Sequence, residues 1–141
     1  MEAKKTAAAV RAAGTKALVV HCDTTSEEQV KAMFTKAEAE LGGVDLMVAV
    51  AGIGKMAPFL DTTVGEFEAV HNVNVKGTYL CIREAGAAMK RGGRAGSIIT
   101  LTSVHGLGGT HYNAIYGSSK QAVIGLTKGA AFDLASANSL I

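Results

Sequence analysis

The 141-residue sequence is short of several residue types, and each shortage excludes a class of protein. It contains no tryptophan, one proline and two cysteines, and 5% of its residues are aromatic. Cys22 and Cys81 lie in apolar stretches without C-x-x-C spacing. We therefore expect reduced thiols in a cytoplasmic protein rather than a disulfide or a metal site. The four histidines are not paired at ligand spacing either, so no metal is expected.

Strong charge of one sign and long apolar runs are also missing. The formal net charge is +2, and the one basic cluster, residues 90–94, is typical of a helix C-terminus that ends at glycine. No aromatic side chains alternate with it, so nucleic acid is not expected as a partner. The longest apolar stretch, residues 44–54, is interrupted by Asp45 and Gly52 and is shorter than the roughly 20 residues that span a bilayer. The first residues lack the pattern of a secretory signal, and no membrane partner is expected.

What the sequence does contain is an alternation of helical and strand-like segments. Ser26, with Glu28 and Gln29 behind it, predicts the start of a helix, and the glycines after residue 41 predict its end. Strands that alternate with helices imply an α/β fold, with a parallel sheet covered on both faces. The expected helices are residues 2–13, the segment from the Ser26 cap to residue 40, 64–89 and 114–135, and the expected strands are 16–21, 46–50 and 97–102.

Tyr116 and Lys120 form the most informative pair in the sequence. They are four residues apart in an expected helix and therefore lie on one face of it. A nearby ammonium favours phenolate over phenol, which turns a weak acid into a usable proton donor and acceptor near neutral pH. The alternative is an ordinary amphipathic helix with a half-buried tyrosine and a solvated lysine.

Two further polar residues occupy positions that suit a ligand site. Ser103 comes thirteen residues before Tyr116, at the end of a β-branched run. A buried parallel strand there would deliver the hydroxyl at the carboxyl edge of the sheet, where ligands of open α/β sheets bind. Asn74 stands within an otherwise helical pattern and is expected to be buried.

This spacing resembles the catalytic set of the short-chain dehydrogenase/reductase family, carried here by Asn74, Ser103, Tyr116 and Lys120. The resemblance extends from about residue 3 to residue 135. It implies a partial doubly wound, Rossmann-like parallel sheet with helices on both faces, and a single incomplete domain over residues 1–141. It also implies hydride transfer between NAD or NADP and an alcohol or ketone.

The resemblance implies a role for each of the four residues. Tyr116 would exchange a proton with the substrate oxygen, and Lys120 would favour the charged form of that tyrosine and hydrogen-bond the ribose next to the nicotinamide. Ser103 would hydrogen-bond the substrate oxygen as charge develops there; Thr102 beside it has the wrong spacing to Tyr116. Asn74 would bend its helix and reach Lys120 through a water, although an amide bonded to local backbone is the alternative reading of Asn74.

The resemblance also implies where the cofactor lies. Asp23 would accept a hydrogen bond from the adenine amino group, with the backbone of Thr24 beside it. A helix N-cap role for Asp23 is the alternative. Ala51 and Gly52 would let the backbone pass close to the cofactor, since glycine permits such an approach.

The chain departs from the family pattern in two ways. Ala49 and Val50 stand where the family usually has two asparagines. Ala49 would still offer backbone groups to the cofactor, but the side-chain bonds that brace the central strands are lost. The second departure is that no strand followed by Gly-x-x-x-Gly-x-Gly is present, the segment whose amides and helix N-terminus hold the pyrophosphate. We therefore expect a domain that lacks the first βαβ unit and the C-terminal strands.

A partial domain has consequences for pairing and activity. In the family's strand order, 3-2-1-4-5-6-7, only the strands near Leu46 and Ser97 would remain neighbours, and unpaired apolar edges would favour aggregation. We expect the chain to be inactive alone, and its full-length parent to be a homo-oligomer acting on a small alcohol or carbonyl compound. The alternative is a truncated, non-catalytic interaction module that pairs with full-length homologues through its two long helices.

Overall fold

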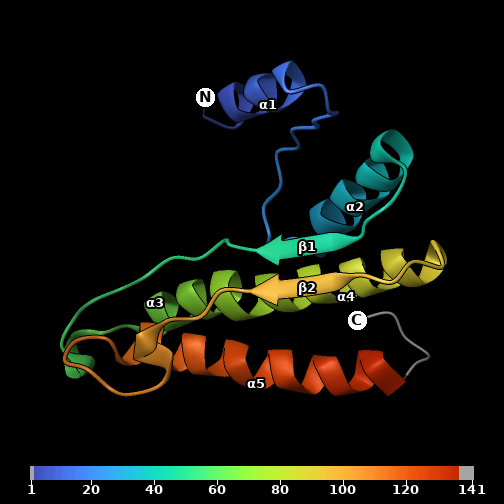
Figure 1. Ribbon diagram of the computed structural model, residues 1–141. Helices are drawn as coiled ribbons and strands as arrows, with labels where there is room; N and C mark the ends of the chain where they lie inside the picture. Colours follow the sequence, from blue (N-terminus) through green and yellow to red (C-terminus); the bar gives the residue numbers. More distant parts are fainter. Residues whose placement is uncertain (1, 137–141) are drawn as a thin grey trace.

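The computed structural model describes residues 2–136, which form two parallel strands and several helices (Figure 1). Strands β1 and β2 pair with Leu46 opposite Ser97, which confirms the predicted neighbours and the α/β class. The longer elements are α1 (Glu2–Ala12), α2 (Glu27–Leu41), β1 (Leu46–Ala49), α3 (Val64–His71), α4 (Gly77–Arg91), β2 (Ser97–Thr100) and α5 (Ala114–Ser136). Three short helical turns complete them: η1 (Phe59–Asp61), η2 (Asn72–Lys76) and η3 (Val104–Gly106).

The boundaries of α2 follow from its caps. The Ser26 side chain accepts a hydrogen bond from the backbone N–H of Gln29, as expected for an N-cap. At the other end Gly42 has a φ of 90°, the left-handed conformation that glycine adopts most easily, and its N–H donates to the carbonyl of Glu38. Both predicted ends of this helix are confirmed to within a residue.

The strand expected at residues 16–21 is wrong. These residues form an irregular chain that links α1, which stands apart from the other helices, to α2 (Figure 1). A strand is stable only when a neighbour completes its ladder of hydrogen bonds. In the part of the chain that the structure describes, the sheet contains β1 and β2 alone, so this apolar segment has no strand to pair with.

The hydrophobic core lies where α2 and α4 meet the sheet. Helix α4 is the most buried element, with Ala85 and Met89 entirely excluded from solvent. The core cluster consists of Val30, Phe34, Met47, Leu80, Cys81, Ile82, Ala85, Ala88 and Met89. Cys22 and Cys81 are free thiols, and burial raises the pKa of each.

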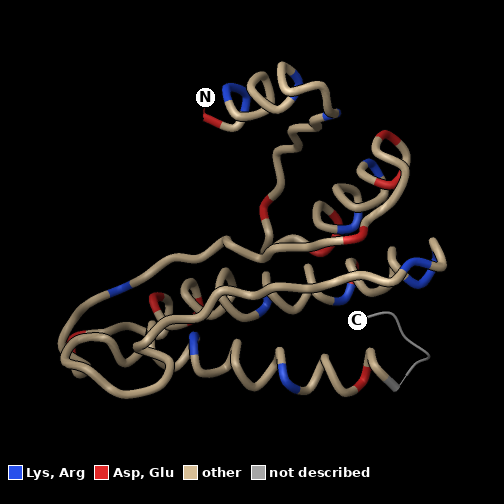
Figure 2. The backbone as a smooth tube through the Cα atoms, viewed as in Figure 1, with Lys and Arg blue, Asp and Glu red and all other residues tan. Residues whose placement is uncertain are grey.

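Charged side chains lie around this core without gathering on one side. Figure 2 shows Lys and Arg on most of the helices. Arg83 and Arg91 of α4 bind Glu27 and Glu38 of α2, at 2.7 and 2.9 Å. Exposed pairs of this kind contribute little stability, so packing is the main contact between these helices. No helix in the described part of the chain is long and apolar enough to cross a membrane.

Within residues 2–136, helices cover one face of the two-stranded sheet, whereas the sequence predicts cover on both faces. Side chains alternate along each strand, and Met47 and Ile98 point toward the helices. Their neighbours Leu46, Val48 and Ile99 point the other way and remain 58%, 47% and 48% exposed. We call these three residues the bare face. It is the side on which a complete doubly wound sheet would carry its second layer of helices.

We predict that backbone amides of residues 16–22 exchange with solvent far faster than those of α4 in the 141-residue polypeptide. The amides of residues 16–22 form no hydrogen bonds with a neighbouring strand, whereas those of α4 are hydrogen-bonded within a buried helix. Hydrogen–deuterium exchange followed by mass spectrometry measures both segments in one experiment. Slow exchange over residues 16–22 would contradict this, and would indicate that the segment pairs with a strand of another copy.

Candidate active site

Tyr116 and Lys120 lie together in the first two turns of α5. The Lys120 Nζ is 5.7 Å from the centre of the Tyr116 ring. Lys120 is only 6% exposed, and its Nζ donates a 2.9 Å hydrogen bond to the carbonyl of Leu101, just beyond β2. The alternative of a solvated surface lysine is therefore wrong. A buried ammonium beside a phenol is an arrangement that can hold and move a proton.

Asn74 fastens the loop that follows β1 to the start of α5. Its Oδ1 accepts a hydrogen bond from the N–H of Ile53 at 2.8 Å. Its Nδ2 donates to the carbonyl of Ile53 and to the hydroxyl of Ser119, each at 2.9 Å. Asn74 is 1% exposed, as expected. Because its side-chain partners are distant in sequence, the alternative of a bond to local backbone is wrong for this side chain.

The helix expected over residues 64–89 is interrupted where Asn74 lies. The π-helical turn η2 separates α3 from α4. A π-turn inserts one extra residue into the helical ladder and re-aims the side chains around it, and such turns are frequent at functional sites. The water-mediated link from Asn74 to Lys120 stays a prediction.

Gly52 lies where the backbone approaches both side chains closely. A Cβ added at this position would meet Asn74 Oδ1 at 3.3 Å and Lys120 Nζ at 3.5 Å. The first distance is tighter than an ordinary van der Waals contact. A glycine at position 52 thus leaves room beside the lysine, as the sequence predicts for a backbone that passes close to a cofactor.

Tyr116, Lys120 and Gly52 line one cavity of about 550 Å³, which we call the tyrosine cavity. It lies at the carboxyl ends of β1 and β2, the edge at which open α/β sheets bind ligands. Its described lining is Val50, Gly52, Ile53, Gly54, Met56, Leu101, Thr102, His105, Asn113, Tyr116 and Lys120. A cavity of this size accommodates a small organic molecule.

Ser103 is close to this cavity but is not among its described lining residues. Strand β2 ends at Thr100, earlier than expected, and Ser103 serves as the N-cap of η3. Its Oγ accepts a 3.2 Å bond from the N–H of His105. Thr102 does line the cavity, but its hydroxyl donates to the carbonyl of Lys120. The substrate-binding role of Ser103 remains a prediction.

The remaining cofactor candidates lie on the other side of the end of β1. Thr24, Ala49 and Ala51 line a second cavity of about 250 Å³, and Val50 lines both cavities. The carbonyl of Ala49 accepts a bond from the N–H of Leu101, so part of its backbone is used within the sheet. The structure thus divides the predicted cofactor residues other than Asp23 between two hollows that share Val50.

Asp23 lies on the surface at the end of the irregular segment. Its Oδ1 accepts hydrogen bonds from the N–H and the hydroxyl of Thr25, both at 2.8 Å. The backbone N–H bond, followed by the hydroxyl bond, holds the pKa of this carboxyl below its ordinary value. The N-cap alternative is wrong for Asp23 because Ser26 caps α2.

Sequence reasoning missed His105 and Asn113, which line the tyrosine cavity. The His105 ring meets the Tyr116 ring edge-on, with centroids 6.2 Å apart and an angle of 69° between their planes. One signal was available: His105 is two residues beyond Ser103 on the loop that leads to Tyr116. A hydroxyl and an imidazole on one short loop before Tyr116 indicate that both can reach the same site.

The family model for short chain dehydrogenases matches residues 1–141. The chain belongs to the short-chain dehydrogenase family. A short-chain dehydrogenase/reductase of Armillaria gallica is 40% identical over 126 residues, which are 89% of this chain and 48% of that protein. The chain spans about half the length of the curated relatives it matches.

Solved structures of the family have the same fold. The short-chain dehydrogenase/reductase of Burkholderia phymatum in complex with NAD superposes with a TM-score of 0.91 at 30% identity, over 97% of this chain and 49% of that one. ElxO with NADP bound gives a TM-score of 0.77 at 38% identity, over 81% of this chain and 46% of that one. These likenesses confirm a partial Rossmann-like fold.

We predict that Asn74→Ala lowers the free energy of unfolding by about 1–3 kcal/mol, since it leaves the N–H and carbonyl of Ile53 without their buried partners. Urea denaturation followed by circular dichroism measures the change. Asn72→Ala, at an exposed position in the same π-turn, is the control and should change the stability by less than about 0.5 kcal/mol. Equal effects of the two substitutions would contradict the role given to Asn74.

Proposed function

We propose that this chain belongs to an enzyme that transfers a hydride between NAD or NADP and the carbon of a small alcohol or carbonyl compound. The observation that carries the proposal is the buried Lys120 ammonium beside the Tyr116 ring in the lining of the tyrosine cavity. A phenol so placed can exchange a proton with an oxygen atom bound in that cavity. The proposal covers the whole protein, of which these residues supply the proton-transferring part.

The residues present fit a nicotinamide cofactor at its two ends. Gly52 keeps space open beside Lys120, whose ammonium can donate to ribose hydroxyls in addition to the carbonyl of Leu101. At the other end, Thr24 and Ala51 line the smaller cavity, and the Asp23 carboxylate beside it can accept a bond from an adenine amino group. The cofactor, when bound, supplies or accepts the hydride.

Tyr116 and Ser103 act on the substrate oxygen in this proposal. Tyr116 gives a proton to that oxygen when a carbonyl is reduced and takes one when an alcohol is oxidised. The N–H of His105 occupies a lone pair of Ser103 Oγ, which leaves the hydroxyl hydrogen to be donated to the substrate oxygen. That bond becomes stronger as negative charge develops on the oxygen.

Lys120 and Asn74 support this proton transfer. The positive charge of Lys120 stabilises a negative charge on the neighbouring phenol oxygen. Asn74 holds the backbone of Ile53 and the hydroxyl of Ser119, the residue next to Lys120. The amide thereby fixes the loop after β1 relative to the first turns of α5, and with it the width of the tyrosine cavity.

We further propose that the complete protein is a cytoplasmic homo-oligomer. Two free thiols suit a reducing compartment, and Phe132 on the outer side of α5 is 81% exposed. An exposed aromatic ring of this kind suits a protein interface. Light scattering of the complete protein tests the oligomeric state. The alternative function is a non-catalytic module that pairs with full-length homologues. It requires that this chain joins their oligomers and catalyses no reaction itself.

We predict that Tyr116→Phe lowers kcat of the complete protein by about 100-fold to 10,000-fold, because it removes the hydroxyl that carries the proton. The dissociation constant of the cofactor should stay nearly unchanged. Steady-state rates and fluorescence titration with NADH and NADPH measure the two quantities. Tyr112→Phe, on an exposed loop tyrosine, is the matched control, and residual activity of Tyr116→Phe near that of the control would refute the proposal.

Lys120→Met should weaken both turnover and cofactor binding, because the ammonium serves the phenol and the ribose alike. Methionine keeps the buried aliphatic part of the side chain, which separates loss of charge from loss of packing. The same titrations measure the effect, and Lys128→Met, at an exposed position of α5, is the control. An unaltered cofactor dissociation constant in Lys120→Met would show that Lys120 does not bind the ribose.

A further inference from the structure

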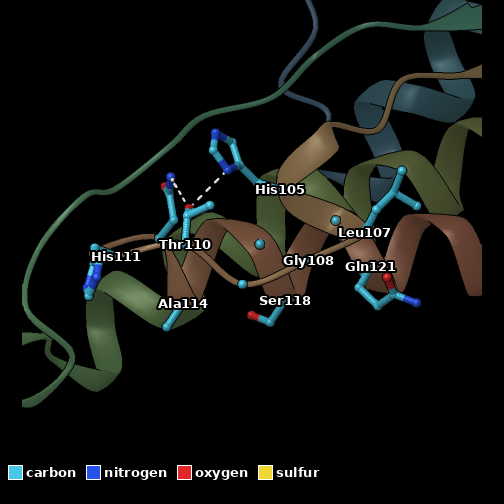
Figure 3. A pocket seen from close by; sticks show the side chains of 12 residues that line it. His105, Leu107, Gly108, Thr110, His111, Ala114, Ser118 and Gln121 are labelled. Carbon is cyan, nitrogen blue, oxygen red and sulfur yellow. Dashed lines mark hydrogen bonds between the residues drawn. The ribbon is translucent and has the colours of Figure 1, made fainter.

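A chain of hydrogen bonds holds the His105 side chain in place. Asn113 is 8% exposed, and its Nδ2 donates to the Thr110 hydroxyl at 3.2 Å. The Thr110 hydroxyl lies 3.0 Å from His105 Nδ1. Figure 3 shows both bonds converging on Thr110, with the second ring nitrogen of His105 pointing away from it. Thr110 and Asn113 therefore orient the imidazole.

The same chain of bonds accommodates an imidazole that carries its hydrogen on the nitrogen facing away from Thr110. An amide NH₂ group can only donate, so the Thr110 oxygen accepts from Asn113. Its own hydrogen is then free to be donated to His105 Nδ1. In the neutral ring, a nitrogen that accepts leaves the hydrogen on the other nitrogen. With the Thr110 hydroxyl donating to Nδ1, His105 presents an Nε2–H donor.

His105 also lines two hollows of the surface. One is the tyrosine cavity, and the other is a cavity of about 530 Å³ whose lining is shown in Figure 3. Its ring lies edge-on to Tyr116, with the centroids 6.2 Å apart. A donor at this distance lies within the span of one small molecule whose reacting oxygen is held at Tyr116.

The other polar side chains of the tyrosine cavity are already engaged in the protein. Thr102 donates to the carbonyl of Lys120, and Asn113 donates to Thr110. Val50, Ile53 and Met56 contribute apolar surface. Asn113 is also buried, whereas His105 is only partly buried. Apart from the Tyr116–Lys120 pair, His105 is therefore the polar side chain of the described lining that is best placed for a substrate atom away from the reacting carbon.

We propose that His105 determines substrate specificity by donating an Nε2–H bond to a second oxygen of the substrate, close to the carbon that is oxidised or reduced. The substrate class is hydroxy- or oxo-substituted alcohols and ketones rather than plain ones. This inference rests on the proposed function, since it assigns a substrate to the same cavity. A ligand without the second oxygen offers this donor no acceptor and forgoes that hydrogen bond.

The test uses the complete protein with NADH or NADPH and two pairs of ketones of equal size. One pair is 4-hydroxy-2-butanone and 2-pentanone; the other is 3-hydroxy-2-butanone and 3-methyl-2-butanone. In each pair a methyl group replaces the hydroxyl, so only the second oxygen differs. We expect kcat/KM to be about ten-fold higher for the hydroxyketone in at least one pair, the effect of one net hydrogen bond.

Variants of His105 separate a substrate bond from a structural role. His105→Leu should lower kcat/KM for the preferred hydroxyketone by about ten-fold, mainly through KM, and leave the matched plain ketone within about two-fold. His105→Gln retains an N–H donor near the position of Nε2 and should restore most of the preference. His111→Leu, an exposed histidine that lies outside the tyrosine cavity, is the control and should behave like the unaltered protein.

Each outcome bears on one of the two proposals. If His105→Leu lowers kcat/KM equally for both members of each pair, or changes neither, His105 does not select the substrate and the inference is overturned while the proposed function stands. No preference for a hydroxyketone by the unaltered protein would overturn it as well. If the unaltered protein reduces none of the four ketones with either cofactor, the proposed function fails, and the inference with it.

Discussion

The buried amide of Asn74 is the interaction on which the site depends. Its three hydrogen bonds join the loop after β1, the π-turn η2 and the first turns of α5. These segments are distant in sequence, and the Tyr116–Lys120 pair faces Gly52 only while they are held together. An apolar residue at position 74 could fill the space but could not satisfy Ile53 at both its N–H and its carbonyl. The chemistry of the site therefore rests on a polar group in the interior of a helix.

The parts of the fold that the sequence predicted correctly are those that local interactions decide or that the family strand order implies. Helix α2 begins and ends at residues whose caps can be read directly, Ser26 and Gly42. The parallel pairing of β1 with β2 follows from the family strand order. The segment at residues 16–21 failed because strand formation depends on a neighbour as well as on an apolar, β-branched composition.

The site was predictable to a similar degree and for a similar reason. Lys120 and Tyr116 share one helix, so their spacing alone places them side by side. The family resemblance implied a bend at Asn74, and the structure has a π-turn there. The partners of the amide, Ile53 and Ser119, were not predictable because they are distant in sequence. His105 was missed because its orientation depends on the irregular loop that leads to α5, and no periodicity describes such a loop.

The two ends of the proposed cofactor site differ in what supports them. Asn74, in the π-turn before α4, bonds to the residues next to Gly52 and Lys120. Helix α4 in turn supplies much of the buried core. Asp23 follows a segment without sheet partners and is anchored mainly by the Thr25 bonds and by the start of α2. The free energy needed to unfold a segment locally is higher where more of its groups are buried and hydrogen-bonded. The end proposed to carry proton transfer is therefore held by more deeply buried hydrogen bonds in this chain than the end proposed to bind adenine.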